Sequence, residues 1–335
     1  MTRGSRVIAL ALAGALAVLV TFSATPPAHA QKKIRLGVFL ASAANTYWTA
    51  AYEGVKDSAA RYGNVELAVF DAQFQTNKQV NQLRDALISG RFDAWFIGPN
   101  DGGPLAPVIR EGLKRGIRIA CTLVPCGPDV RNTRIQISGV IAQIGIGFYE
   151  NGQHLGQLVA EACKGLNRCE VLWLPGLPQL PLEKARTDGL LSVLKNYPRI
   201  KIVSIQPGGY LAAPALTATQ NVLQAHPEID VIVSSGDQMI DGAYRAARAK
   251  GLAANIKLVG NGCTFEAVKA IREGRQFACA VYLPRTEGRI AADLLIRALR
   301  GERVEGRSID PLVFSPVGPI VTKDNVDRFS PEFHS

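Results

Sequence analysis

The chain has 335 residues, a formal net charge of +10 at pH 7 and six cysteines. This length is sufficient for two domains of ordinary size. The basic residues are scattered along the chain and are not interleaved with aromatic residues, a distribution that argues against a nucleic-acid-binding surface.

The first thirty residues have the pattern of a secretory signal peptide. Two arginines precede an apolar run at 7–20, and small residues at 28 and 30 form a cleavage site. The apolar run is too short for a stable membrane span. We therefore expect a cleaved signal at 1–30 and an exported, soluble mature chain that begins at Gln31. Removing 30 residues from 335 leaves 305, and removing the two arginines leaves a net charge of +8.

From residue 34 onward, short apolar runs alternate with amphipathic segments, many of which end at glycine. This β-α alternation with short connections predicts an α/β fold built on doubly wound parallel sheets. The first series has expected strands at 34–40, 65–70, 94–98, 117–123 and 134–138, and helices at 45–62, 78–89 and 104–115. A long helix at 141–163 then precedes strands at 170–174, 200–206, 231–233, 256–259 and 277–282, and helices at 182–196, 212–225, 239–250, 264–272 and 285–300.

Two loops repeat one arrangement of residues. The strand at 94–98 is followed by Pro, Asn and then Asp101, and the strand at 231–233 is followed by small residues and then Asp237. In open α/β sheets, ligands bind beyond the carboxyl ends of the strands. The repeat therefore indicates two similar lobes that face one cleft. Each aspartate is also well placed to act as a helix N-cap, and the sequence leaves both roles open.

The six cysteines form three local pairs, and an exported protein can hold disulfides. Cys263 follows one expected strand and Cys279 lies in the next, which makes that bridge the best supported. Free buried thiols are the alternative for the other two pairs. No C-x-x-C or H-E-x-x-H motif occurs, and we expect no metal site. The expected pairs are Cys121 with Cys126, Cys163 with Cys169, and Cys263 with Cys279.

Several short motifs follow one another in order over nearly all of the mature chain. They are IRLGV at 34–38 with NTYW at 45–48, FIGPND at 96–101, EKARTDG at 183–189, AHPEID at 225–230, GDQMIDGA at 236–243, KLVG at 257–260 and LP at 283–284. Their order and spacing resemble the type I periplasmic binding proteins, in the ribose-binding branch.

This resemblance implies two Rossmann-like lobes that are joined by a three-crossover hinge and close over a small ligand. The crossovers are expected near 138–142, 282–285 and 310–315. The N-terminal lobe would then comprise 31–138 plus 284–312, and the C-terminal lobe would comprise 139–283 plus 313–335.

The resemblance also implies where the ligand binds. Tyr47 and Trp48 lie where the family stacks aromatic rings on the ligand, although either ring could instead belong to the core. Asp101 lies where a carboxylate accepts hydrogen bonds from ligand hydroxyl groups. The full set of expected ligand contacts is Asn45, Tyr47, Trp48, Asp101, Lys184, Arg186, Asp237, Asn261 and Tyr282.

The chain departs from the ribose binders at Cys121, Asn261 and Tyr282, which indicates a more aromatic and less polar pocket than a pentose site. The resemblance implies a monomeric periplasmic protein that captures a small polar solute, a sugar or polyol, and delivers it to the permease of an ABC importer. No cofactor is implied. The absence of a G-x-S-x-G motif and the wide spacing of the histidines argue against an enzyme.

A second resemblance gives an alternative function. The Tyr47-Trp48 pair, the helix after it and the segment 312–331 are similar to the periplasmic partner of a trimethylamine-N-oxide sensor kinase. A cage of Tyr47, Trp48 and Tyr282 would suit a methylated amine. In that case the ligand-bound protein would dock on a membrane sensor kinase instead of a permease.

Overall fold

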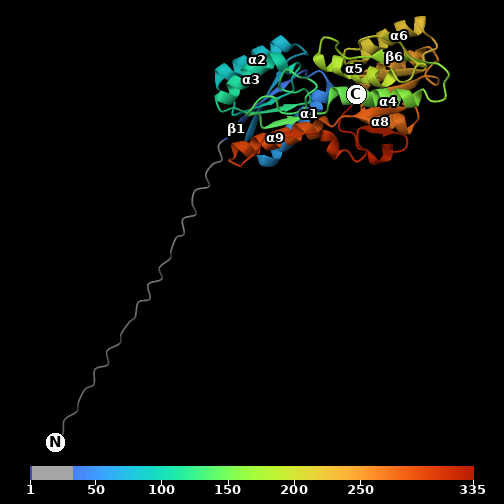
Figure 1. Ribbon diagram of the computed structural model, residues 1–335. Helices are drawn as coiled ribbons and strands as arrows, with labels where there is room; N and C mark the ends of the chain where they lie inside the picture. The colour runs from blue at the N-terminus through green and yellow to red at the C-terminus, as the bar shows by residue number, and fades with distance from the viewer. Residues whose placement is uncertain (2–32) are drawn as a thin grey trace. The chain divides into compact units, whose positions relative to one another are not determined.

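The computed structural model describes Met1 and residues 33–335. The expected signal peptide at 1–30 therefore lies, apart from Met1, outside the described residues. Residues 33–335 form two α/β lobes, each built on one six-stranded sheet, and Figure 1 shows helices on both faces of the sheets. Within this part of the chain, every helix is too short or too polar to span a membrane.

The first lobe contains a sheet with the strand order β11-β5-β4-β3-β1-β2, in which all neighbours pair in parallel. Its helices include α9, which comes late in the chain and packs along α1 (Figure 1). The elements are β1 (Ile34–Leu40), α1 (Thr46–Tyr62), β2 (Val65–Asp71), α2 (Thr76–Ser89), β3 (Ala94–Ile97), α3 (Gly102–Lys114), β4 (Arg118–Thr122), β5 (Ala142–Ile144), α9 (Pro284–Leu299) and β11 (Arg307–Ile309).

The second lobe contains a sheet with the order β12-β10-β9-β8-β6-β7, in which only β12 runs antiparallel to its neighbour. Its elements are α4 (Phe148–Ala162), β6 (Cys169–Leu174), α5 (Pro181–Leu194), β7 (Ile200–Ile205), α6 (Ala212–Ala225), β8 (Val231–Ser234), α7 (Asp237–Ala249), β9 (Lys257–Gly262), α8 (Phe265–Arg272), β10 (Ala278–Val281) and β12 (Ile320–Thr322). Two short 3-10 helices, η1 (Pro311–Phe314) and η2 (Val326–Arg328), flank β12 in the chain.

The two lobes share one topology. The order β2-β1-β3-β4-β5 in the first sheet matches β7-β6-β8-β9-β10 in the second. The strands before Asp101 and Asp237, β3 and β8, hold the same place in their sheets. This confirms the fold class predicted from the sequence, because the repeated loops do come from two similar lobes.

The first passage between the lobes differs from the sequence prediction. The expected strand at 134–138 does not form, and the expected helix at 141–163 is wrong in its first turns. Residues 142–144 instead form β5, which pairs with β4 and β11 and is buried throughout. At Gly145 a Cβ atom would lie 2.4 Å from the carbonyl oxygen of Leu123, so the chain is still packed against the first lobe there. The crossing therefore lies at 145–147, just before α4.

The other two passages connect β10 to α9 and β11 to β12. The chain leaves β10 at Tyr282 and enters α9 of the first lobe at Pro284. It leaves β11 after Ile309 and returns through η1 to β12 of the second lobe.

Glycines allow the main helix pair of each lobe to pack backbone against backbone. A Cβ atom on Gly54 of α1 would lie 2.0 Å from the carbonyl oxygen of Arg285 in α9. In the second lobe, a Cβ atom on Gly189 of α5 would lie 2.0 Å from the carbonyl oxygen of Tyr149 in α4. The same pair is close at Gly152 of α4, whose Cβ atom would lie 2.0 Å from the Arg186 carbonyl oxygen. This packing fixes the position of α5 and of the Arg186 side chain that it carries.

All three expected cysteine pairs form disulfides. The alternative of free buried thiols, considered for Cys121 with Cys126 and for Cys163 with Cys169, is therefore wrong. Each bridge closes a short stretch of chain within one lobe, at Cα–Cα distances of 6.0, 5.7 and 5.4 Å that are usual for disulfides. In chain order the bridges join Cys121 to Cys126, Cys163 to Cys169, and Cys263 to Cys279.

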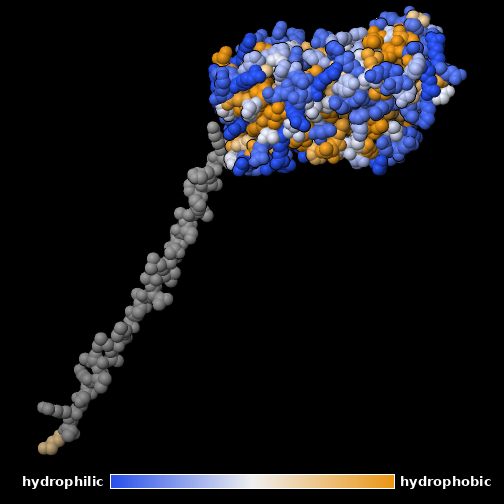
Figure 2. Space-filling model, in the orientation of Figure 1, coloured by the Kyte–Doolittle hydropathy of each residue, from blue (hydrophilic) through white to orange (hydrophobic). Residues whose placement is uncertain are grey.

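Each sheet carries an apolar cluster on both of its faces. The view in Figure 2 shows a surface that is largely hydrophilic, with apolar patches that include one over α6. Next to α6, Leu211 and Ile205 are each about half exposed.

We expect Gly189→Ala to lower the free energy of unfolding by about 1–3 kcal/mol, because the added methyl group has no room between α4 and α5. Denaturant unfolding followed by circular dichroism would measure this change. Leu191→Ala, on the exposed side of the same helix, is the control and should change it by less than about 0.5 kcal/mol. Equal effects of the two substitutions would contradict this account of the packing.

Candidate functional site

A pocket lies between the two lobes where the carboxyl ends of their strands meet. The space in it that water-sized molecules can occupy amounts to about 60 Å³. One ordered water needs about 10–15 Å³ on this measure, so the pocket suits a small ligand. The lining residues are Ala41, Asn45, Tyr47, Trp48, Phe74, Pro99, Asn100, Leu123, Leu180, Leu182, Arg186, Tyr210, Ser235, Gly236, Gln238, Asn261, Tyr282 and Phe333.

Aromatic rings from both lobes form one wall of this pocket. Asn45 caps α1 by accepting a hydrogen bond from the backbone N–H of Tyr47 (3.1 Å), which fixes the start of the helix. The Tyr47 ring meets the rings of Trp48, Tyr282 and Phe333 edge to face, with centroids 5.0, 5.6 and 6.1 Å away. These distances lie in the favourable range for aromatic pairs. The rings thus pack together and also line the pocket, so the packing of Tyr47 and Trp48 in the core does not remove them from the pocket wall.

Asn100 is the polar residue of the first lobe that is best placed to bind a ligand. It follows β3, lines the pocket and is 1% exposed. Its side-chain oxygen and nitrogen both lack a hydrogen-bond partner among the described residues. The loop is held by Gln79, which accepts from the Asn100 backbone N–H (2.9 Å) and donates to the Gly98 carbonyl (2.8 Å). A buried amide without partners is unfavourable, and a ligand that bonds to it removes the penalty.

Asp101, one residue later, has a different environment. Its side chain accepts a hydrogen bond from the backbone N–H of Gly103 (3.0 Å) and caps α3. It does not line the main pocket but borders a separate small cavity together with Gly127 and Pro128. Because the backbone is extended there, successive side chains point in different directions. The structure thus brings Asn100, and not Asp101, to the pocket.

Asp237 is also outside the pocket lining, although its neighbours Gly236 and Gln238 belong to it. It is the first residue of α7, and its carboxylate accepts a hydrogen bond from the Thr264 backbone N–H (2.9 Å). It therefore neither caps its own helix nor faces the pocket, but holds the loop between β9 and α8. Burial raises the pKa of this carboxyl group to about 6, and its Oδ1 atom lacks a hydrogen-bond partner in the described part of the chain.

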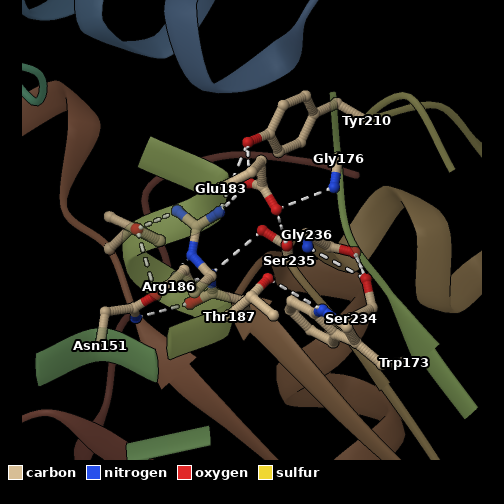
Figure 3. Close-up of polar contacts among 12 residues, drawn as sticks. Asn151, Trp173, Gly176, Glu183, Arg186, Thr187, Tyr210, Ser234, Ser235 and Gly236 are labelled. Carbon is tan, nitrogen blue, oxygen red and sulfur yellow. Dashed lines mark hydrogen bonds and ion pairs between the residues drawn. The ribbon is translucent and has the colours of Figure 1, made fainter. Parts of the chain in front are cut away.

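Of the two expected basic contacts, only Arg186 reaches the pocket. Lys184 is exposed and forms an ion pair with Asp188 one turn along α5 (2.9 Å). Arg186 is buried, and Figure 3 shows it at the centre of a network of polar side chains. Its Nε donates to Asn151 (2.8 Å), one terminal nitrogen donates to the Tyr282 hydroxyl (3.0 Å), and the other pairs with Glu183.

The Glu183 carboxylate has several hydrogen-bond partners (Figure 3). Besides the ion pair with Arg186, its carboxylate accepts hydrogen bonds from Ser235 Oγ (2.6 Å), the Gly176 backbone N–H (3.0 Å) and the Tyr210 hydroxyl. Burial is the largest single effect and lowers the pKa of Arg186, but Glu183 together with Tyr282 and Tyr210 raises this pKa well above its ordinary value, so the guanidinium stays charged. Both side chains of the pair are thus charged, and their two charges cancel. The hydrogen bonds from the surrounding residues restrain both side chains.

Asn261 extends this network toward the pocket, which it lines as expected. Its oxygen accepts from Asn151 (3.0 Å), and its nitrogen donates to the Ser235 carbonyl (3.0 Å).

Behind the aromatic wall, Tyr47 donates to Glu287 (2.8 Å), which does not line the pocket. Burial raises the pKa of the Glu287 carboxyl group well above its ordinary value, which favours its uncharged form. Neither lobe therefore presents an unpaired charge among the described lining residues.

The disulfides lie apart from the pocket, since no cysteine is among the described residues that line it. Cys126 lies three residues after the lining residue Leu123, but it is buried in the apolar cluster that covers the opposite face of the first sheet. Its backbone N–H donates to the side chain of Gln143 in β5 (3.1 Å), and its sulfur is bonded to Cys121 of β4. Cys126 therefore holds the loop after β4 in place and has a structural role, not a ligand-binding one.

The lobes also touch each other directly around the pocket. Gln238 of the second lobe donates a hydrogen bond to Thr46 Oγ1 of the first (2.6 Å). Arg131 of the first lobe pairs with Asp188 of the second (2.6 Å). These polar contacts span the gap and would have to break for the lobes to separate.

One group of side chains among the described residues has ligand atoms close enough to hold a metal ion. Glu170, His226 and Glu228 have such atoms within 4.8 Å of one another. The group lies at the start of β6, at the end of the sheet opposite to the pocket. Arg168 forms an ion pair with Glu170 and already supplies a positive charge there. We therefore assign no metal to this group.

A comparison with families of known proteins agrees with this architecture. Residues 36–303 match the family described as periplasmic binding protein domain. The chain belongs to the periplasmic binding protein family. The resemblance noted in the sequence is thereby confirmed, and a binding role without catalysis fits the family.

Individual periplasmic binding proteins show similarity over most of their length. The ribose import binding protein RbsB of Salmonella typhimurium is 23% identical over 289 residues, which are 86% of this chain and 92% of that protein. The periplasmic protein TorT of Escherichia coli is 24% identical over 321 residues, 92% of this chain and 83% of that protein. The structure of the Caulobacter myo-inositol binding protein bound to myo-inositol superimposes on this chain with a TM-score of 0.75 at 22% identity. The match covers 90% of this chain and 97% of that one, so the two proteins share a common fold.

Sequence reasoning missed several residues that line the pocket of this periplasmic binding protein or hold Arg186 beside it. Asn100 was passed over for its charged neighbour, and Phe333 lies far along the chain from the other lining residues. Glu183 lies within the EKARTDG motif and could have been found as the natural partner of a buried arginine three residues away. Tyr210 and Asn151 carry no local signal, because only the packing of separate elements brings them to Arg186.

The raised pKa of Asp237 gives a prediction about pH. Its carboxyl group has a pKa of about 6 in the folded chain against an ordinary value of 3.8, so the folded chain binds this proton more tightly than the unfolded chain. The resulting stabilisation is fully present below about pH 4 and is lost as the pH rises through 6. Asp237→Asn can still accept from Thr264 and has no such dependence. We expect its stability relative to wild type to rise by about 2–3 kcal/mol between pH 4 and pH 7.5.

Denaturant unfolding of both proteins at a series of pH values would measure this difference. A difference in unfolding free energy that stays constant across the range would contradict the assignment of the buried carboxyl group.

Proposed function

We propose that this protein captures a small, uncharged, hydroxyl-bearing ligand, a sugar or polyol, between its lobes and delivers it to the permease of an ABC importer. In this proposal the signal peptide at 1–30 directs the protein to the periplasm, where it acts as a monomer. The ligand contacts are the amides of Asn100 and Asn261, the tyrosine and tryptophan rings, and the guanidinium of Arg186, all of which line the pocket.

The observation that carries the proposal is the unpartnered amide of Asn100 in a pocket without an unpaired charge. A primary amide offers one acceptor and two donor hydrogens, which match the hydroxyl groups of a sugar or polyol. A ligand with a net charge would need a counter-charge, but Glu183 and Arg186 already neutralise each other. The aromatic rings offer flat apolar surfaces for the C–H face of such a ligand.

The relatives support the same class of ligand. One is named as a ribose import binding protein, and a protein with the same fold was solved with myo-inositol. Both ligands are small and uncharged and carry several hydroxyl groups. The departures at Asn261 and Tyr282 make ribose itself no stronger a candidate than other members of this class.

Thermal-shift screening of the mature protein would test the proposal. The panel contains D-ribose, D-allose, myo-inositol and glycerol, with trimethylamine N-oxide and a dicarboxylate for comparison. A ligand present at a hundredfold excess over its Kd stabilises the folded state by about 2.7 kcal/mol. We expect a shift with at least one sugar or polyol and none with the dicarboxylate. A shift with the dicarboxylate alone would contradict the proposal.

A second candidate function is favoured by the cluster of four rings that Tyr47 forms with Trp48, Tyr282 and Phe333. A methylated amine or amine oxide is bound well by aromatic faces and needs few hydrogen bonds. In this alternative the protein senses such a ligand and its partner is a membrane sensor kinase. A thermal shift with trimethylamine N-oxide, together with no shift for any sugar or polyol, would favour this alternative over the first.

The roles of neighbouring residues in the β3–α3 loop give a matched pair of variants. Asn100→Ala removes hydrogen bonds to the ligand, each of which contributes about 0.5–1.5 kcal/mol, and we expect at least tenfold weaker binding of the ligand found in the screen. Asp101→Ala removes only the helix cap, so we expect binding within threefold of wild type and a loss of about 1 kcal/mol of stability. Titration calorimetry and denaturant unfolding would measure the two effects.

The stability of the ligand-free protein is a second readout for this pair. Asn100→Ala removes a buried amide that has no partner, so this variant should unfold no more easily than wild type. If Asp101→Ala instead weakened binding as strongly as Asn100→Ala does, the assignment of the two residues would be wrong.

A further inference from the structure

The segment Glu332–Ser335, which we call the strap, contacts both lobes. It follows η2 of the second lobe, and Figure 1 marks the C-terminal residue near the junction of the two lobes. The strap has no regular secondary structure, so side-chain and backbone bonds to its neighbours hold it in place.

On the second lobe, the strap is attached to the start of α8. The Phe265 backbone N–H donates to the Phe333 carbonyl (3.0 Å), and the His334 ring stacks on the Phe265 ring with centroids 4.7 Å apart. Glu266 interacts with His334 Nδ1 (2.7 Å) and accepts from the Ser335 backbone N–H (2.8 Å). These bonds join consecutive residues of the strap to one helix end.

On the first lobe, the strap is attached to α9 and α1. The Glu332 carboxylate accepts from the Thr286 backbone N–H (3.0 Å) and from the Thr286 hydroxyl (2.5 Å) in the first turn of α9. A carboxylate is favourable at a helix N-terminus, where backbone N–H groups are free. The Phe333 ring packs edge to face on Tyr47 of α1 and belongs to the apolar cluster of the first lobe.

Phe333 also forms part of the ligand pocket. It is 6% exposed and lines the pocket together with Tyr47 and Tyr282. A Cβ atom on Gly262 of β9 would lie 3.0 Å from its ring, so the ring is in contact with the second lobe as well. The side chain that fills this side of a cavity of about 60 Å³ thus comes from the strap.

From these contacts we propose that the strap couples the two lobes, and that Phe333 limits the size of the ligand that the pocket accepts. Bonds to α8 on one side and to α9 and Tyr47 on the other keep the lobes in contact in the absence of ligand. Loss of the ring enlarges the pocket and lets larger ligands bind. Only this second part rests on the proposed function, because the coupling of the lobes does not depend on what the pocket binds.

Small-angle X-ray scattering of the ligand-free mature protein tests the coupling. A compact chain of this length has a radius of gyration of about 19 Å. Glu332→Ala, which frees the strap from α9, and Phe333→Ala, which frees it from Tyr47, should each increase the radius relative to wild type. Asp327→Ala is the control, because Asp327 is exposed and pairs with Arg272 of the same lobe. Circular dichroism verifies that each variant is folded, and a radius equal to that of wild type in every folded strap variant would overturn the coupling.

Titration of glycerol, D-ribose and myo-inositol into wild type and Phe333→Ala tests the size limit. We expect the ratio of the myo-inositol to the glycerol affinity to increase at least tenfold in the variant. An unchanged order and ratio of the three affinities would overturn the size limit, and so would the absence of binding of every probe to both proteins. If Phe333→Ala binds a probe and wild type binds none, that result counts against the proposed function. The scattering result decides the coupling of the lobes on its own.

Discussion

The buried ion pair between Glu183 and Arg186 is the constraint on which the site depends. Both side chains lie in α5, three residues apart, and are almost fully buried. Removing two charges from water is unfavourable unless each finds partners, and here Asn151, Tyr210, Ser235 and Tyr282 supply them. The second lobe thereby presents to the pocket a polar wall that has no net charge and whose side chains are held by hydrogen bonds.

Because the wall of the second lobe has no net charge, the kind of ligand that the pocket suits also depends on the groups of the opposite wall. The first lobe adds aromatic rings and the amide of Asn100, whose two polar atoms have no partner among the described residues. Glycines allow α4 to pack closely on α5, and α1 to pack closely on α9. This packing fixes the position of each pocket wall within its own lobe. Between the two lobes lies a small pocket whose described lining residues present no unpaired charge.

The fold could be predicted from the sequence because it rests on patterns that are local in the chain. Buried apolar runs, glycine helix ends and the repeated loops before Asp101 and Asp237 were sufficient to indicate two lobes of one topology. The cysteine pairs were equally accessible, since each lies within a short stretch of chain. The helix expected at 141–163 failed because β5 is stabilised by its pairing with β4 and β11, partners that the local pattern does not reveal.

The site was harder to predict than the fold. The sequence pointed to two loops that border the pocket, but the choice between Asn100 and Asp101 depends on which side chain the backbone turns toward the pocket. Arg186 was expected to grip the ligand, whereas most of its hydrogen bonds go to protein groups. Phe333 reaches the pocket only through the path of the strap, which carries no regular pattern.

A crystal structure of the mature protein with its bound ligand would test the central claim most directly. The account predicts an uncharged, hydroxyl-bearing molecule that is hydrogen-bonded to the Asn100 side chain and lies against the rings of Tyr47 and Trp48. A ligand with a net charge that separates Glu183 from Arg186, or one bound away from Asn100, would contradict it.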